Sequence, residues 1–168
     1  MPEYAINSAV ELLENLELND VGCYELTAAR GIEHESGREI VGPGAVTDLV
    51  IEDQDEELGV YWLGGGGRLL VRLAFVLRTN AGDLRAGVQA EWDTGPLRRS
   101  DVSPDAEEDW VNRVAVMAIV PYIRSAISDL AVRVFGSNIV MPLVRPNELA
   151  FTSLREDHEQ SMLSESSD

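Results

Sequence analysis

The triplet Asp93-Thr94-Gly95 is the stretch of this sequence whose residue types best match a known catalytic arrangement. Two such aspartates, brought together from two loops, share one proton and act as an acid–base pair. A homodimer of this chain could supply both. The surroundings fit poorly, because Glu91 precedes the triplet and Pro96 follows it, where small and apolar residues are required. We therefore interpret the triplet as a strand end that enters a Gly-Pro turn.

The other residues that could do chemistry form no recognisable site. An aspartic protease of the retropepsin kind is the enzyme alternative, but we expect no enzyme, no catalytic residue and no cofactor. His34 and His158 lie in polar stretches without the spacing of metal ligands, so no metal is expected. The acidic run at residues 53–56 lacks the rest of a calcium loop. The glycine run at residues 64–67 lacks the Lys and Ser/Thr of a phosphate-binding loop.

The composition narrows the partners and the compartment. The chain has 168 residues and a formal net charge of −17, which argues against nucleic acid and anionic membrane surfaces as partners. The single cysteine, Cys23, excludes an internal disulfide. The acidic start is unlike a signal peptide, and no apolar run reaches the roughly 20 residues of a membrane span. We expect one domain over residues 1–155, an acidic tail over residues 156–168 and a cytoplasmic location.

Alternating apolar and polar residues predict an antiparallel sheet. The clearest strands are residues 68–78 and 84–93, joined by a turn at residues 80–83. Pairing them gives a hairpin with one apolar and one charged face. Four further segments are predicted: a helix at residues 7–17 capped by Asn7 or Ser8, a strand at residues 16–29 with a bulge near Gly22, a loop at residues 31–44 and a strand at residues 46–51 that the acidic run ends.

A long helix is predicted from residue 104 to residue 135. Ser103 and Pro104 give it a capped start, and Gly136 follows its end. Its apolar residues occupy two faces, which predicts burial on two faces. Pro121 cannot donate its backbone hydrogen bond, so a kink is expected there. One face would cover the sheet, and the other would pack on a copy of the same helix through Val116, Ile119, Val120, Ile123 and Ile127.

This helix holds the apolar-apolar-Pro-Tyr-x-Arg motif of residues 119–124, followed by Gly136 and by an extended segment with Met141-Pro142-Leu143. The order and spacing resemble those of the SecB family of protein-export chaperones. The resemblance implies an α+β fold, in which a four-stranded antiparallel sheet packs on the long kinked helix and on a short last helix starting near Asn147. The helix at residues 7–17 would be an addition to that fold.

The resemblance implies an ATP-independent holdase that binds unfolded or export-destined polypeptides in apolar grooves and assembles as a homotetramer, a dimer of dimers. An alternative is a dedicated chaperone of one client, such as the antitoxin of a toxin–antitoxin pair. The added helix favours it, as does a crossover loop in which Leu97 lies where the family has an aromatic residue. Docking of the motor ATPase SecA is implied for Asp20 and Glu25. The predicted groove residues are Tyr61, Trp62, Trp92, Leu97, Leu149, Phe151 and Leu154.

Overall fold

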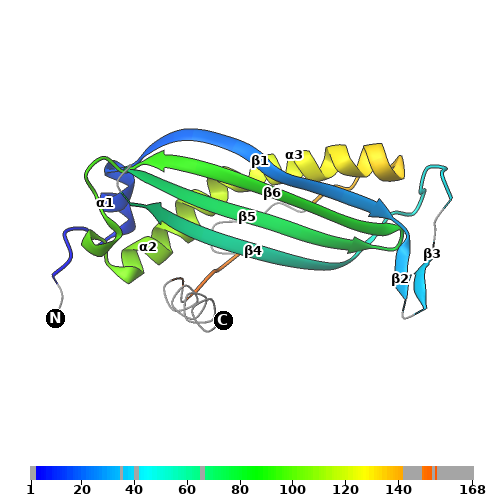
Figure 1. The fold of residues 1–168 in the computed structure, drawn as a ribbon, viewed down its shortest axis with the longest axis horizontal. Helices are drawn as coiled ribbons and strands as arrows, with labels where there is room; N and C mark the ends of the chain where they lie inside the picture. Colours follow the sequence, from blue (N-terminus) through cyan, green and yellow to red (C-terminus); the bar gives the residue numbers. More distant parts are fainter. Residues whose placement is uncertain are drawn as a thin grey trace.

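The computed structural model describes residues 3–34, 36–39, 42–64, 67–141, 149–152 and 154. A four-stranded antiparallel sheet lies along one long helix, and a short helix near the N-terminus closes one end (Figure 1). This is the predicted α+β arrangement. The elements are α1 (Ala9–Glu14), β1 (Glu17–Arg30), β2 (Ile32–His34), β3 (Gly37–Glu39), β4 (Ile51–Leu63), β5 (Arg68–Thr79), β6 (Gly82–Asp93), the 3-10 turn η1 (Arg99–Asp101), α2 (Pro104–Trp110), the π-helical turn η2 (Val111–Ala115) and α3 (Val116–Phe135).

The sheet has the strand order β1-β6-β5-β4. Its central hairpin is the predicted one, because β5 and β6 pair in register with Leu73 opposite Val88 and Leu77 opposite Leu84. These apolar side chains are buried in the core, whereas Arg78 alternates onto the exposed outer face. The sheet therefore has one face in the core and one toward solvent.

Strand β4 corrects the sequence-based prediction. A strand was expected at residues 46–51, ended by the acidic run, but β4 begins at Ile51 and contains that run. Asp53, Asp55 and Glu57 alternate onto the outer face, where arginines of β5 and β6 pair with them. The prediction was wrong because the charges are neutralised by neighbouring strands, which the local sequence does not show.

Strand β1 is an edge strand with two irregularities. Its register with β6 shifts at Asn19 and again at Tyr24. A single bulge was predicted near Gly22, which instead pairs regularly between the two shifts. Each extra residue changes the alternation by one position, so Val21, between the bulges, and Leu26, beyond them, point to the same side.

The loop predicted at residues 31–44 holds a small hairpin instead. Strands β2 and β3 pair antiparallel, with Ile32 opposite Glu39. The hairpin extends from the end of the sheet that is far from α1 (Figure 1). The chain then returns toward β4, and the Val46 N–H donates to the Phe135 carbonyl at 2.8 Å. This contact joins the returning segment to the end of α3.

The long helix begins and ends as predicted. Ser103 caps α2, Pro104 occupies its first turn, and Gly136 follows α3 with a φ of 67°. The hydrogen-bonding pattern changes at η2, ahead of Pro121, which lies within α3. By length and composition alone the run Pro104–Phe135 could cross a membrane. Here it lies along the sheet (Figure 1).

The face of α3 that was predicted to meet a second copy meets the sheet instead. Its five residues are each 4% exposed or less and belong to the protomer's core: Val116, Ile119, Val120, Ile123 and Ile127. The prediction of these residues was wrong because both faces of the helix are apolar, and spacing alone does not say which one the sheet covers. Tyr122, on another face, is 50% exposed.

Helix α1 connects the N-terminus to the segment before α2. Ser8 caps it, as one of the two predicted alternatives, and Leu12 is fully buried. The helix packs against α2, and just before it Ile6 forms a parallel bridge with Val102. The added N-terminal helix therefore supports residues 94–103, which we call the crossover loop.

Apolar side chains of the C-terminal segment pack on the core. Residues 149–152 are not helical, contrary to the helix predicted from Asn147. The rest of that prediction, the acidic tail at residues 156–168 and His158 lie outside the described residues. The apolar side chains that contact the core are Ile139, Met141, Leu149, Phe151 and Leu154.

Candidate functional site

A cavity of about 540 Å³ opens at the end of the sheet where the β4–β5 turn faces the crossover loop. We call it the end pocket. Its volume lies in the range of roughly 300–1,000 Å³ that is usual for ligand sites. It is lined by Trp62, Leu63, Gly64, Gly67, Arg68 and residues 94–99.

Two hydrogen bonds fix the wall of the end pocket that the crossover loop forms. The Asp93 carboxylate accepts from the Gly95 N–H at 2.7 Å, and the Thr94 N–H donates to the Gly67 carbonyl at 2.7 Å. Gly67 and Gly95 have φ values of 60° and 53°, and a Cβ on Gly67 would lie 2.8 Å from the Gly95 oxygen. The triplet Asp93-Thr94-Gly95 thus shapes a tight turn at an exposed strand end.

A buried carboxylate fixes the floor of the end pocket to α2. Glu107 is 1% exposed and accepts a hydrogen bond from the Trp62 indole N–H at 2.9 Å. It also pairs with the Arg99 guanidinium at 3.0 Å. Burial of a carboxylate requires such pairing. The three residues come from α2, β4 and η1, so they set the position of the crossover loop relative to the sheet.

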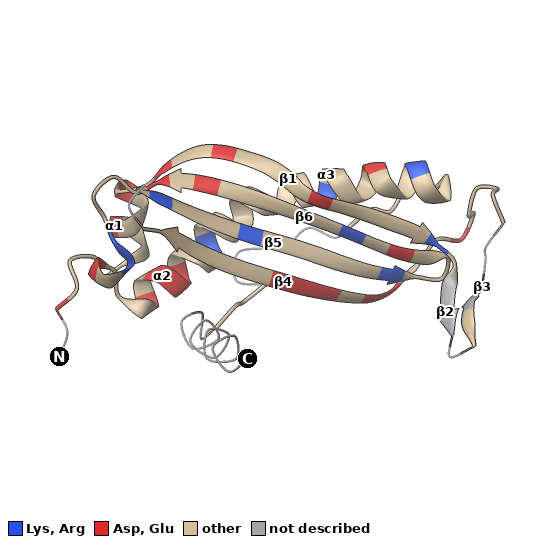
Figure 2. Ribbon diagram, viewed as in Figure 1, with Lys and Arg blue, Asp and Glu red and all other residues tan. Residues whose placement is uncertain are grey.

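Three arginines, Arg68, Arg98 and Arg99, line the end pocket, although the chain carries 13 Lys and Arg against 30 Asp and Glu. Among the described lining residues, none is a carboxylate. Arg99 pairs with Glu107, and Arg68 lies 3.6 Å from Glu91. Within the described part of the chain, the Arg98 guanidinium forms no ion pair. Figure 2 shows basic segments at this end of the molecule, on β5 and on the loop before α2.

The predicted groove residues separate into different surroundings. Trp62 and Leu97 both line the end pocket. Trp92 is 3% exposed and packs edge-on against Trp110, with ring centroids 4.9 Å apart. Trp92 is therefore a core residue, and its large side chain contributes to stability rather than to an open groove.

The remaining predicted groove residues lie away from the end pocket lining. Tyr61 is 37% exposed on the outer face of the sheet. Leu149, Phe151 and Leu154 are half-buried against the core. The backbone of Phe151 is held by the side chain of Asn112 in η2. The three C-terminal residues therefore contribute to the packing of the protomer. Of the predicted groove residues, only Trp62 and Leu97 lie together at one cavity.

Sequence reasoning missed the polar residues of the end pocket. Arg98 and Arg99 directly follow Leu97, and two adjacent arginines in so acidic a chain were an available signal. Glu107 lies in the first turn of a helix, where a carboxylate is common, and Arg68 begins a strand, so neither carries a distinctive local signal. Their convergence depends on the hairpin and the crossover loop meeting, which is a long-range feature.

The residues weighed for catalysis or metal binding are scattered. His34 lies in β2, and Cys23 is an exposed free cysteine in β1. Asp93 holds a turn amide, as described above. Within the described residues, no three His, Cys, Asp or Glu side chains gather as a metal site.

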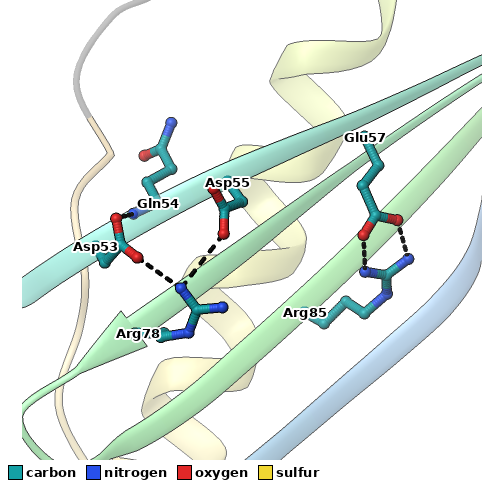
Figure 3. A network of polar contacts seen from close by, with 6 residues as sticks. All are labelled: Asp53, Gln54, Asp55, Glu57, Arg78 and Arg85. Atoms are coloured by element: carbon teal, nitrogen blue, oxygen red, sulfur yellow. Dashed lines mark hydrogen bonds and ion pairs between the residues drawn. The ribbon is translucent and has the colours of Figure 1, made fainter.

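The residues predicted to dock a motor ATPase lie on β1. Asp20 is exposed. Glu25 lies 2.8 Å from Arg85, and Arg85 also pairs with Glu57 at 2.6 Å. Figure 3 shows Arg85 holding Glu57 beside Arg78, which pairs with two further carboxylates of β4. The hydrogen bond from Arg85 lowers the pKa of Glu57 below its ordinary value. Because Glu25 pairs with Arg85, it already has a partner within the sheet.

A second hollow of about 270 Å³ lies between β1 and α3. Leu26 and Tyr122 line it and are 47% and 50% exposed. No described strand pairs with the outer edge of β1. An edge strand beside exposed apolar side chains is a surface on which another chain can pack.

No family model and no curated protein matches the sequence. The solved structure of the Mycobacterium tuberculosis Rv1957 SecB-like chaperone, in complex with a ChAD peptide from the Rv1956 HigA1 antitoxin, is similar to this chain with a TM-score of 0.59 and 16% identity. The match covers 82% of this chain and 93% of that one. A protein of unknown function from Streptococcus agalactiae matches with a TM-score of 0.46 and 9% identity, over 76% and 97% of the two chains.

The fold of this chain is SecB-like. The four-stranded antiparallel sheet and the long C-terminal helix packed on it are the features of that fold, and the N-terminal helix is additional to them. Its expected fold class is thereby confirmed.

Proposed function

We propose that the protein is an ATP-independent, SecB-like chaperone that binds an extended segment of a client polypeptide in the end pocket. The observation that carries the proposal is the end pocket itself, in which Trp62 and Leu97 from distant parts of the chain form an open apolar wall. The SecB-like fold supports it, since the solved SecB-like chaperone of that fold holds a peptide. Burial of apolar client surface at about 25 cal/mol per Å² supplies affinity without a catalytic group.

A single dedicated client, such as an antitoxin, suits this site better than a wide range of unfolded or export-destined chains. A broad groove would need the side chains of Trp92 and Phe151 to be free, but Trp92 is 3% exposed and Phe151 is half-buried against the core. The accessible apolar wall is therefore short and matches a short segment. General holdase activity is the second candidate, favoured by the exposed Leu26 and Tyr122 around the second hollow.

The proposed assembly is a homotetramer built as a dimer of dimers. Since the core face of α3 is covered by the sheet, the edge of β1 and the surface around Tyr122 would meet the other copies. A motor ATPase such as SecA would dock on β1 through Asp20, because Glu25 is paired with Arg85.

Two measurements test the proposed function. Light scattering of a chemically unfolded client, diluted with and without the protein and without ATP, tests general holding. Fluorescence anisotropy with labelled peptides from candidate antitoxins tests dedicated binding. Leu97→Ser should weaken peptide binding several-fold, whereas Val140→Ser, at a residue that is 77% exposed and outside the end pocket lining, should not. If the two variants behave alike, the end pocket is not the client site.

A further inference from the structure

The end pocket combines an apolar wall with arginines in an otherwise acidic protein. We propose that it selects client segments in which an apolar side chain is flanked by acidic residues. The apolar side chain would rest against Trp62 and Leu97, and the carboxylates would pair with Arg98 and Arg68. This inference rests on the proposed function, and it names the chemical class of the client.

Arg98 is the first reason for an acidic client. Its side chain lines the end pocket and has no ion pair with a described residue. Its backbone is nevertheless fixed, since the Arg98 N–H donates to the Asp101 carboxylate at 2.8 Å and its carbonyl accepts from the Asp101 N–H at 3.0 Å. A guanidinium presents a planar fork of donors that matches a carboxylate with two hydrogen bonds. The Arg98 side chain is therefore available to pair with a client carboxylate at the end pocket.

Arg68 is the second reason. It begins β5, and its side chain is 52% exposed. Its nearest carboxylate, on Glu91, lies 3.6 Å away, which is longer than the roughly 2.7–3.2 Å of a hydrogen bond. A pair this loose and exposed contributes little, so Arg68 can turn to a client carboxylate at small cost.

The rest of the molecule makes the preference local. Arg78, Arg85 and Arg99 are each already paired with carboxylates of this chain. The net charge of −17 repels an acidic polypeptide from the remaining surface. The arginines of the end pocket attract an acidic client, and the acidic remaining surface repels it. The client is thereby directed to one position, because binding elsewhere is opposed.

The test uses three labelled 12-residue peptides with the same central apolar residues, flanked by Glu, by Gln or by Lys. Their affinities for the full chain are measured by fluorescence anisotropy. Arg98→Gln and Arg68→Gln are compared with Arg78→Gln, a matched control because Arg78 lies toward the other end of the same strand with an identical 52% exposure. Circular dichroism checks that each variant is folded.

The Glu-flanked peptide should bind the wild-type protein most tightly and the Lys-flanked peptide least. Arg98→Gln and Arg68→Gln should each weaken the Glu-flanked peptide by roughly three- to tenfold and leave the Gln-flanked peptide unchanged. Arg78→Gln should change neither. Equal binding of all three peptides, or a preference for Lys, would overturn the charge preference and leave the proposed function standing. Failure of every peptide and candidate client to bind would remove the proposed function as well. Loss of peptide binding when the protein self-associates would also remove it, since the proposed assembly is a tetramer.

Discussion

The side-chain amide of Asn112 forms two hydrogen bonds with the backbone of Phe151, donating to its carbonyl oxygen and accepting from its N–H, each at 2.8 Å. Asn112 lies in the π-helical turn η2 and is 7% exposed. The same amide donates to the Glu108 carbonyl at 3.0 Å. One side chain thus satisfies the backbone of a residue 39 positions away and fixes the C-terminal segment to the long helix.

Asn112→Ala should destabilise the protein by about 1–3 kcal/mol, because both backbone groups of Phe151 lose their partner. For a domain of this size, each kcal/mol lowers Tm by roughly 2–4 °C. Thermal unfolding followed by circular dichroism measures the change. Asn138→Ala is the control, since Asn138 is exposed and accepts one hydrogen bond from Ser128. Equal losses of Tm would show that the Phe151 contact has no special weight.

Glu107→Gln should cost about 3 kcal/mol of unfolding free energy, measured by urea denaturation. The substituted amide can still accept from Trp62, but Arg99 loses the charge that it pairs with. Asp105→Asn removes an exposed carboxylate from the first turn of the same helix and should cost well below 1 kcal/mol. A loss from Glu107→Gln no greater than that of Asp105→Asn would contradict the role given to the buried carboxylate.

Gly67→Ala and Gly95→Ala separate strain from steric conflict at the end pocket. Both glycines have positive φ, so each substitution carries a backbone cost of roughly 1–2 kcal/mol. Only Gly67 has a neighbour in the way, the Gly95 oxygen at 2.8 Å from an added Cβ, while a Cβ on Gly95 meets nothing within 4 Å. Gly67→Ala should therefore lower both Tm and client affinity more than Gly95→Ala. The reverse order would mean that the turn and the loop are not in contact.

The Glu57–Arg85 pair should add a pH-dependent increment of stability. Because Arg85 lowers the pKa of Glu57 in the folded state, the increment is present above the unfolded pKa of about 4.3 and is lost as pH falls through the folded pKa. The difference in unfolding free energy between wild type and Glu57→Gln should be no more than about 1 kcal/mol at pH 7, since the pair is exposed, and should shrink as the pH falls through the lowered pKa of Glu57. In an Arg85→Gln background, Glu57→Gln should have no such effect.

The proposed assembly predicts that Leu26→Glu together with Tyr122→Glu converts the oligomer to smaller species. Both side chains are about half exposed at the hollow between β1 and α3, so the monomer fold should survive the change. Size-exclusion chromatography with light scattering gives the mass. Val140→Glu, at a more exposed apolar residue, is the control and should leave the mass unchanged. A wild-type protein that elutes as a monomer would contradict the assembly outright.

The central hairpin and the long helix could be predicted from sequence because their signals are local. Alternation defines β5 and β6, and Ser103 with Pro104 and Gly136 defines the helix ends. Strand β4 could not be predicted in this way. Its acidic residues are compatible with a strand only because Arg78 and Arg85, from two other strands, lie across from them.

The candidate site could be predicted only in part, because some of its contacts join segments that are distant in the sequence. Trp62 and Leu97 were among the predicted groove residues, and both line the end pocket. Trp92 was predicted with them but is buried against Trp110, a contact between a strand and a helix that composition does not report. The arginines and Glu107 acquire their role only when the crossover loop meets the hairpin.

The two bulges of β1 have a consequence for how this protein can handle unfolded chains. A free strand edge with a regular row of N–H and C=O groups can template the growth of a sheet, as in amyloid. The register shifts at Asn19 and Tyr24 break that row into short stretches. An incoming chain therefore finds few consecutive backbone partners along β1. For a protein that is proposed to bind extended segments, this irregularity makes the β1 edge a poor template for aggregation of its own client.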